Sequence, residues 1–159
     1  MTNDKPIHVL FVCLGNICRS PMAEAIFQNL VDDAGLSDQI KVESAGTGAY
    51  HIGEQAHRGT RQILAQQHIE YNGRSRQVTS ADMADKSTYI ITMDQSNSDD
   101  LNAQYGKHPR LSRLLDYATQ SNEQNIPDPY YTSSFEIVFQ LVEDGCRGLL
   151  TAVRQQERI

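Results

Sequence analysis

The sequence contains no tryptophan, only three cysteines and no long hydrophobic run. The cysteines, Cys13, Cys18 and Cys146, form no CxxC pair and no Cys/His ligand spacing, which argues against both a secreted disulfide framework and a structural zinc site. The most apolar run, Val9–Leu14, is far shorter than the roughly 18 residues of a membrane-spanning helix. We therefore expect reduced thiols, no bound metal and no membrane span.

Basic residues are also scarce, because 14 Lys and Arg stand against 20 Asp and Glu, for a net charge of -6. Such a charge repels a phosphate backbone, so we expect no nucleic-acid partner. The segment Met1–Pro6 lacks the basic start and the cleavage site of a signal peptide, which favours a cytoplasmic location. With 39% hydrophobic and 21% charged residues among 159, the composition excludes disordered and collagen-like chains. It predicts one globular domain over residues 1–159, which we expect to be a monomer.

The secondary structure is predicted to alternate between strands and helices. Residues 7–12 are almost wholly apolar and β-branched, as in a central parallel strand that is covered on both faces. The next helix is predicted to have Ser20 as its N-cap and Pro21 as its first residue, and to end at Gly35. This order predicts a doubly wound α/β fold, a four-stranded parallel sheet flanked by helices, with ligands at the carboxyl ends of the strands. The other predicted elements are strands at 40–44, 88–93 and 110–115 and helices at about 56–67 and 96–105.

Two features mark the C-terminal part of the chain. Residues 116–132 form a long irregular segment, and segments of this length in compact domains are often functional. Ser133 and Glu136 have the spacing of a capping box and predict the start of the last helix. Cys146 falls on the apolar stripe of that helix, so we expect it in the core.

The loop after the first strand is the expected site, because it combines a thiol with a guanidinium. Residues 13–21 read C-L-G-N-I-C-R-S-P, and a loop between a strand and a helix N-terminus is a natural anion site. It is not a Walker A motif, because it has a single glycine and no lysine before its serine. Arg19 offers a planar fork of donors for two phosphate oxygens, and a positive field of this kind favours the thiolate form of Cys13. The loop therefore predicts a phosphate site with a thiolate nucleophile.

This loop resembles the signature loop of the low-molecular-weight protein tyrosine phosphatases. Residues 128–131, D-P-Y-Y, followed by Phe135-Glu136, resemble the general-acid loop of that family, and the resemblance extends over nearly the whole chain. It implies a phosphoric monoester hydrolase that removes phosphate from phosphotyrosine in a protein substrate, needs no metal or cofactor, and forms a phosphocysteine intermediate.

The resemblance also assigns roles to individual residues. Cys13 is the expected nucleophile and Arg19 the phosphate clamp. Asp128 is the expected general acid and base, because a phenolate with a conjugate acid of pKa about 10 must be protonated as it leaves. The remaining expected residues are the phosphate-binding loop Leu14, Gly15, Asn16, Ile17, Cys18, Arg19 and Ser20, the supporting Ser44 and Asp94, and the substrate-flanking Tyr50, Tyr130 and Tyr131.

One departure from the family concerns the support of Ser44. Many members carry a histidine a few residues before the segment that matches Arg76-Gln77, where it bonds to the serine equivalent to Ser44. Here the aligned residues 72–75 read N-G-R-S, so we expect no support of Ser44 through such a histidine. The histidines that the chain does have show no ligand spacing, and we expect surface or packing roles for His8, His51, His57, His68 and His108.

Three alternatives were weighed against this function. Thioredoxin-linked arsenate reductase uses two further cysteines near the middle of its chain, and none lies between Cys18 and Cys146. Protein arginine phosphatase is typified by Thr where Ile17 stands and by an acid loop with fewer tyrosines than this chain has. A catalytically dead phosphate-binding module is disfavoured because the nucleophile, the clamp and the acid are all present. For Cys18, a packing role and a redox role, in which it captures an oxidised Cys13, both remain open.

Overall fold

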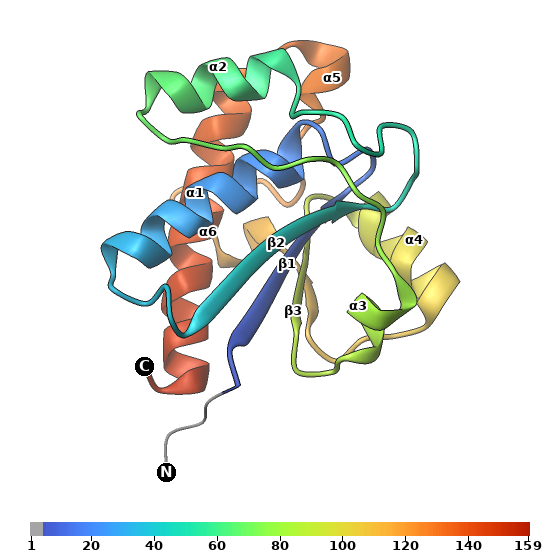
Figure 1. Cartoon of the computed structure of the whole chain (residues 1–159), viewed down its shortest axis with the longest axis vertical. Coiled ribbons are helices and arrows are strands. Elements are labelled where there is room, and N and C mark those ends of the chain that lie inside the picture. The colour runs from blue at the N-terminus through green and yellow to red at the C-terminus, as the bar shows by residue number, and fades with distance from the viewer. Residues whose placement is uncertain (1–4) are drawn as a thin grey trace.

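A computed structural model describes residues 5–159 (Figure 1). Residues 1–4, which belong to the predicted domain and to the segment expected to lack a signal peptide, lie outside the described residues. The elements in chain order are β1 (Ile7–Cys13), α1 (Arg19–Asp33), β2 (Ile40–Gly46), α2 (Arg58–Gln66), α3 (Ser80–Ala84), β3 (Tyr89–Thr92), α4 (Gln95–Tyr105), β4 (Leu111–Arg113), the 3-10 helix η1 (Leu114–Tyr117), α5 (Pro129–Thr132) and α6 (Phe135–Glu157).

The strands form one parallel sheet in the order β2-β1-β3-β4, which confirms the predicted four-stranded parallel sheet. β1 is central and pairs with both β2 and β3, so its residue Phe11 lies opposite Ser44 on one side and Ile91 on the other. Its side chains alternate between two cores. Val9 and Phe11 belong to the core under α1 and α6, whereas Leu10, with Val12, belongs to the core under α3 and α4. Figure 1 shows these two pairs of helices on opposite sides of the sheet.

The sheet brings the carboxyl ends of β1, β2 and β3 to one edge. β1 ends at Cys13, β2 ends at Gly46, and the residue after the end of β3 bonds back to the first strand, because Met93 N–H donates to Val12 O at 3.1 Å. The loops that follow these strands therefore start from neighbouring points. In the described residues 5–159, no helix is long and apolar enough to cross a membrane.

The predicted start of the first helix is wrong by two residues. α1 begins at Arg19, and its N-cap is Cys18, which makes no side-chain capping bond. Ser20 lies inside the helix, because its hydroxyl is engaged by Cys13 Sγ at 3.0 Å and Asn16 Nδ2 at 2.8 Å instead of capping. Pro21 still lies in the first turn, where its missing N–H needs no partner.

The predicted capping box of the last helix is also wrong. α6 begins at Phe135 after Ser134, which makes no side-chain capping bond. Ser133 instead ends the short helix α5 in a left-handed conformation with φ 60°. Neither α3 nor α5 was predicted. The fourth strand is shorter than the predicted 110–115, because residues 114–117 turn into η1. The ends of the other predicted strands, and of the helices predicted at 56–67 and 96–105, lie within two residues of those in the structure.

Candidate active site

The loop from Cys13 to Arg19 is held with its carbonyl groups turned outward. The Leu14 carbonyl accepts from Gly48 N at 2.9 Å, and the Ile17 carbonyl accepts from His57 N at 2.7 Å. Because the N–H of a trans peptide points opposite to the carbonyl before it, the loop amides turn to the concave side. Two more carbonyls are held by side chains, Gly15 O by Ser75 Oγ and Cys18 O by Thr60 Oγ1, both at 3.0 Å.

The backbone N–H of Asn16 points to this concave side, because it donates to Cys13 Sγ at 3.3 Å. Asn16 has φ 56°, a left-handed conformation that asparagine tolerates better than most residues. The Cys13 side chain is buried, and its sulfur also lies 3.0 Å from Ser20 Oγ. Two polar hydrogens can therefore point at the sulfur.

A pocket of about 450 Å³ opens above this loop. All but one of its lining residues are among the predicted site residues. The exception is His51, for which the sequence predicted a surface or packing role and no place in the site. The His51 ring lies on the pocket wall, and its Nδ1 is 2.7 Å from Glu54 Oε2. The lining residues are Cys13, Leu14, Gly15, Ile17, Cys18, Arg19, Tyr50, His51, Asp128, Tyr130 and Tyr131.

Arg19 is almost fully buried at the base of the pocket, with 3% of its surface exposed. Its Nη1 donates to Asp94 Oδ2 at 2.5 Å and to Ile126 O at 2.9 Å, so one side of the guanidinium is fixed. Burial alone would lower the pKa of Arg19, but the negative charges of Cys13, Asp94 and Asp128 raise it above its ordinary value. The guanidinium is therefore a permanent positive charge at the base of the pocket.

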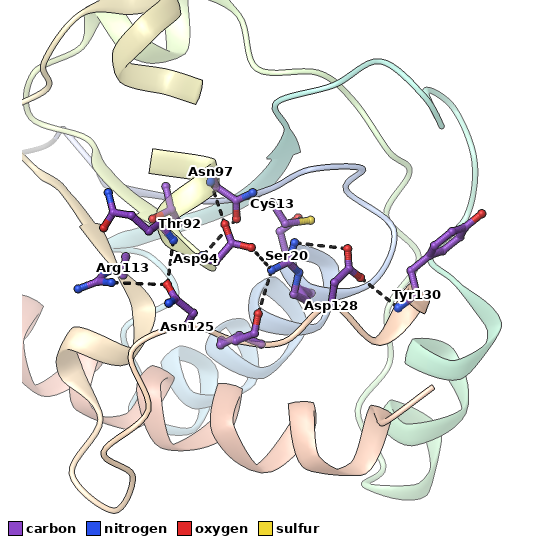
Figure 2. A network of polar contacts seen from close by, with 12 residues as sticks. Cys13, Ser20, Thr92, Asp94, Asn97, Arg113, Asn125, Asp128 and Tyr130 are labelled. Carbon is purple, nitrogen blue, oxygen red and sulfur yellow. Dashed lines mark hydrogen bonds and ion pairs between the residues drawn. The ribbon is translucent and has the colours of Figure 1, made fainter. Parts of the chain in front are cut away.

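Asp94 and Asp128 are placed by the helices that they cap. Asp94 is the N-cap of α4 and accepts from Asn97 N at 2.8 Å, which leaves its second oxygen for Arg19. Asp128 is the N-cap of α5, where its Oδ1 accepts from Tyr130 N at 3.0 Å and its Oδ2 faces Arg19 Nη2 at 3.5 Å. Figure 2 shows the two carboxylates flanking Cys13.

Exposed aromatic rings surround the entrance. Tyr50 is 73%, Tyr130 50% and Tyr131 75% exposed. The rings of Tyr130 and Tyr131 meet edge to face at 5.2 Å, and the ring of His57 lies 6.0 Å from that of Tyr130. In Figure 2 the Tyr130 ring points away from Asp128. Rings at such a rim can pack on an aromatic substrate.

The supporting residues form a hydrogen-bonded line behind the loop. Asn16 Nδ2 donates to Ser20 Oγ at 2.8 Å and to Ser44 Oγ at 3.0 Å. Ser44 in turn donates to Glu24 Oε1 at 2.5 Å, and Tyr71 donates to the same oxygen at 3.0 Å. Sequence analysis named Asn16, Ser20 and Ser44 but missed Glu24 and Tyr71, because neither belongs to a motif and they lie 47 residues apart.

Cys18 differs from Cys13 in its surroundings. Burial, followed by the negative charges of Asp128 and Cys13, raises the pKa of Cys18 to about 12, although Arg19 acts in the opposite direction. Cys18 is therefore a thiol at neutral pH. Within residues 5–159, no group of three or more His, Cys, Asp or Glu side chains has an arrangement that could hold a metal ion.

Comparisons with known proteins agree with one another. The low molecular weight phosphotyrosine protein phosphatase family matches residues 8–159. The low molecular weight protein-tyrosine-phosphatase YfkJ of Bacillus subtilis is 47% identical over 156 residues, which cover 96% of this chain and 99% of YfkJ. The crystal structure of YfkJ superimposes with a TM-score of 0.91 at 48% identity and covers 98% of both chains.

Two further relatives differ in their named activity. The low molecular weight protein-tyrosine-phosphatase PtpA of Staphylococcus epidermidis is 47% identical over 145 residues, which cover 91% of this chain and 92% of PtpA. The crystal structure of a Drosophila arginine phosphatase superimposes with a TM-score of 0.81 at 31% identity, and covers 92% of this chain and 97% of that chain.

Proposed function

The chain belongs to the low molecular weight phosphotyrosine protein phosphatase family, and from this premise we propose that it hydrolyses phosphotyrosine in proteins through a phosphocysteine intermediate. One observation carries the proposal. Cys13 and Arg19, at the two ends of one loop, and Asp128, 109 residues after Arg19, line one pocket above that loop, whose amides turn inward. A nucleophile, a phosphate clamp and a proton donor are the groups that this reaction requires.

In the first step, the Cys13 thiolate attacks phosphorus in line with the ester oxygen. A sulfur–phosphorus bond forms as the phosphorus–oxygen bond breaks, and Asp128 gives its proton to the leaving phenolate oxygen. Arg19 and the loop amides bind the remaining phosphate oxygens, whose charge they stabilise throughout. The products of this step are tyrosine and phosphocysteine.

In the second step, water attacks the phosphorus of phosphocysteine. Asp128, now a carboxylate, takes a proton from that water as the sulfur–phosphorus bond breaks and the Cys13 thiolate is restored. Phosphate leaves, and no metal enters either step. The Asp128 carboxylate is suited to both roles because its Oδ1 accepts from the backbone N–H of Tyr130, and this bond holds the carboxylate at the pocket.

The shape of the entrance favours phosphotyrosine as the substrate. Tyr50, Tyr130 and Tyr131 offer exposed ring surface to the phenyl ring of a phosphotyrosine. Ile17 adds an apolar side chain to the pocket wall. A phosphoserine side chain is too short to use these rings.

Phosphoarginine is the second candidate substrate, because a Drosophila arginine phosphatase shares the fold. A guanidinium group gains less than a phenyl ring from the apolar Ile17, so we rank this activity below the first. The deciding experiment compares kcat/KM for phosphotyrosine, phosphoserine and phosphoarginine peptides of one sequence at matched concentrations. A preference for phosphoarginine would replace the proposed substrate and keep the mechanism.

We further propose that residues 1–159 act as one catalytic domain, as a monomer in the cytoplasm, without a metal or a nucleic-acid partner. The net charge of -6 and the three unpaired cysteines support this proposal. Light scattering at micromolar concentration, cell fractionation and assays with and without chelator test its parts separately.

A further inference from the structure

A line of polar side chains connects the nucleophile to Tyr71, which the mechanism above does not use. The line is built from three elements, because Glu24 lies on α1, Ser44 on β2 and Tyr71 in the segment after α2. Its links are Tyr71 Oη to Glu24 Oε1 at 3.0 Å, Ser44 Oγ to Glu24 Oε1 at 2.5 Å, Asn16 Nδ2 to Ser44 Oγ at 3.0 Å, Asn16 Nδ2 to Ser20 Oγ at 2.8 Å, and Ser20 Oγ to Cys13 Sγ at 3.0 Å.

The direction of these hydrogen bonds follows from the orientation of the side-chain amide of Asn16. Its Oδ1 accepts from Arg76 N at 3.0 Å, so its Nδ2 is the end that faces the two serines. Both Nδ2 hydrogens are used, and each serine oxygen receives one of them. Each serine must then give its own hydrogen to a further acceptor. For Ser44 that acceptor is the carboxylate of Glu24, which also accepts from Tyr71.

Ser20 has two acceptors within reach. Cys13 Sγ lies at 3.0 Å and Ala45 O at 3.5 Å, so the sulfur is the better placed. A hydrogen bond from the Ser20 hydroxyl stabilises the thiolate that the reaction needs. The line therefore ends in a donor aimed at the nucleophile, provided that Asn16 stays in place.

Glu24 keeps this direction only while it is ionised. Burial raises the pKa of Glu24 above its ordinary value, although the hydrogen bonds from Ser44 and Tyr71 act in the opposite direction. Of the charged groups that face it, Glu43 raises the pKa further and Arg76 lowers it. A protonated Glu24 that donated its hydrogen to Ser44 would no longer accept the hydrogen of the Ser44 hydroxyl. Tyr71 thus supplies one of the bonds that hold Glu24 in its accepting form.

The phenol of Tyr71 reaches Glu24 through space that a neighbouring glycine leaves open. A Cβ atom built on Gly73 would lie 2.2 Å from Tyr71 Oη and 2.4 Å from Cζ. No side chain can occupy position 73 while Tyr71 keeps its place. Gly73 stands in the stretch where sequence analysis found the expected histidine missing.

We propose that Tyr71 is a positioning residue which, through Glu24, Ser44 and Asn16, holds the Ser20 hydroxyl as a donor to Cys13 Sγ. The proposal rests on the proposed function in one respect, that Cys13 is the nucleophile. Tyr71 itself is not among the residues that line the active-site pocket.

The first test is Tyr71→Phe, which removes the hydroxyl and keeps the ring. We expect kcat for phenyl phosphate to fall by about three- to tenfold with KM nearly unchanged, a part of the effect that one hydrogen bond to a charged group can have. We also expect Cys13 to be alkylated by iodoacetate about two- to fivefold more slowly at pH 6, because a less stabilised thiolate is less populated. Tyr117→Phe is the matched control, because its hydroxyl bonds to Ser112 Oγ at 2.7 Å, outside the line.

The second test is Gly73→Ala, which displaces the phenol without changing Tyr71. The φ of Gly73 lies outside the left-handed region, so alanine fits the backbone and the main conflict is with the Tyr71 ring. We expect Gly73→Ala to reproduce the loss of kcat and of alkylation rate seen in Tyr71→Phe. In the double variant the two losses should not add, because both remove the same hydrogen bond.

Two outcomes would overturn the proposal. One is a Tyr71→Phe protein with a lowered melting temperature but wild-type kcat and alkylation rate, which makes the hydroxyl a stability contact only. The other is additive losses in the double variant. The alkylation assay needs no phosphatase substrate, so it reports on the line to Cys13 even when the activity assays contradict the proposed function.

Discussion

The guanidinium of Arg19 lies 3.5 Å from the carboxylate of Asp128, so the proposed phosphate clamp and the proposed proton donor face each other across the pocket. Asp128 keeps 24% of its side-chain surface exposed, whereas Arg19 keeps 4%. A phosphate dianion that binds Arg19 must place an oxygen near this carboxylate. Two negative charges at that distance repel, so the carboxylate of Asp128 weakens the binding of a phosphate dianion at Arg19.

Asp128→Asn should separate the acid role from binding. We expect kcat for phosphotyrosine to fall by about 10²–10⁴-fold, because the leaving phenolate is no longer protonated. Aryl phosphates with more acidic leaving groups should lose progressively less, since they need little protonation. The measurement is kcat across a series of leaving groups. Equal losses across the series would make Asp128 a structural residue.

The same variant should bind oxyanions more tightly than the wild type. Removing the carboxylate charge beside Arg19 removes a repulsion against vanadate and phosphate, so their inhibition constants should fall. Competitive inhibition of Asp128→Asn by vanadate measures this effect. Asp38→Asn is the control, because Asp38 is exposed and far from the pocket lining. Unchanged inhibition constants in Asp128→Asn would contradict the repulsion.

Cys13→Ser and Arg19→Lys test the other two groups. Cys13→Ser should abolish turnover, because a serine hydroxyl is not ionised where a thiolate is. Arg19→Lys should lower kcat by about 10²-fold or more, because a lysine is a point charge and cannot replace a planar fork held by Asp94 and aimed at two phosphate oxygens. Steady-state and burst kinetics measure turnover in both variants, and acid-quenched reactions show whether phosphocysteine forms. Appreciable turnover by Cys13→Ser would remove Cys13 from the nucleophile role.

Much of the fold could be predicted because its determinants are local. Residues 7–12 are almost wholly apolar, and the sheet buries Val9, Leu10, Phe11 and Val12 between two layers of helices. The errors occur where a side chain is used by the site rather than by the helix. Ser20 looks like an N-cap, but its hydroxyl serves Cys13. Ser133 looks like an N-cap, but Pro129 starts a separate short helix that Ser133 ends.

Some residues of the site could likewise be predicted from local sequence, and others could not. The motif residues Cys13, Arg19 and Asp128 could be named from the sequence, because each stands in a recognisable segment. Glu24 and Tyr71 could not, since their meaning depends on α1 and the segment after α2 lying side by side. His51 was missed for another reason, because a histidine without ligand spacing has no distinctive pattern. Its place directly after Tyr50, an expected rim residue, is the one sequence feature that pointed to the pocket.

Stability at acid pH should depend on Asp82, which is paired with Arg76 in two hydrogen bonds of 2.8 Å and 3.2 Å. Burial alone would raise the pKa of Asp82, but hydrogen bonds from Arg76 and Thr79 and the charge of Arg76 lower it below its ordinary value. The folded pKa is thus below the unfolded pKa of about 3.9. The contribution is therefore fully present above that value and is lost as pH falls through the folded pKa.

Asp82→Asn should accordingly unfold about 1 kcal/mol more easily than the wild type at pH 7, with the difference shrinking below pH of about 4. Urea unfolding at several pH values measures it, with Asp38→Asn as an exposed control. A difference that stays constant down to pH 2 would show that the charge of Asp82 contributes nothing. The pair also matters for the site, because the Arg76 amide holds Asn16 Oδ1.

Cys18 is predicted to act as a slow partner for an oxidised Cys13. Peroxide converts the Cys13 thiolate to a sulfenic acid, and condensation with the Cys18 thiol gives a disulfide and water. The Cys18 thiolate is the attacking form, and its pKa of about 12 makes that form scarce at neutral pH. Below that pKa the thiolate fraction rises about tenfold per pH unit, so the linkage should form faster from pH 7 to 9.

Mass spectrometry of peroxide-treated protein should therefore show a peptide with Cys13 linked to Cys18, in an amount that grows with pH, and phosphate should protect by covering Cys13. Thiol reductant should restore the activity of the peroxide-treated wild-type protein. Cys18→Ser should keep most of its initial activity but lose this recovery, because nothing then stops oxidation from proceeding to sulfinic acid. Cys146→Ser is the control, since Cys146 is fully buried in α6 and its sulfur faces Ala23 O at 3.7 Å. If Cys18→Ser recovers as completely as the wild type, Cys18 packs beneath the loop and has no redox role.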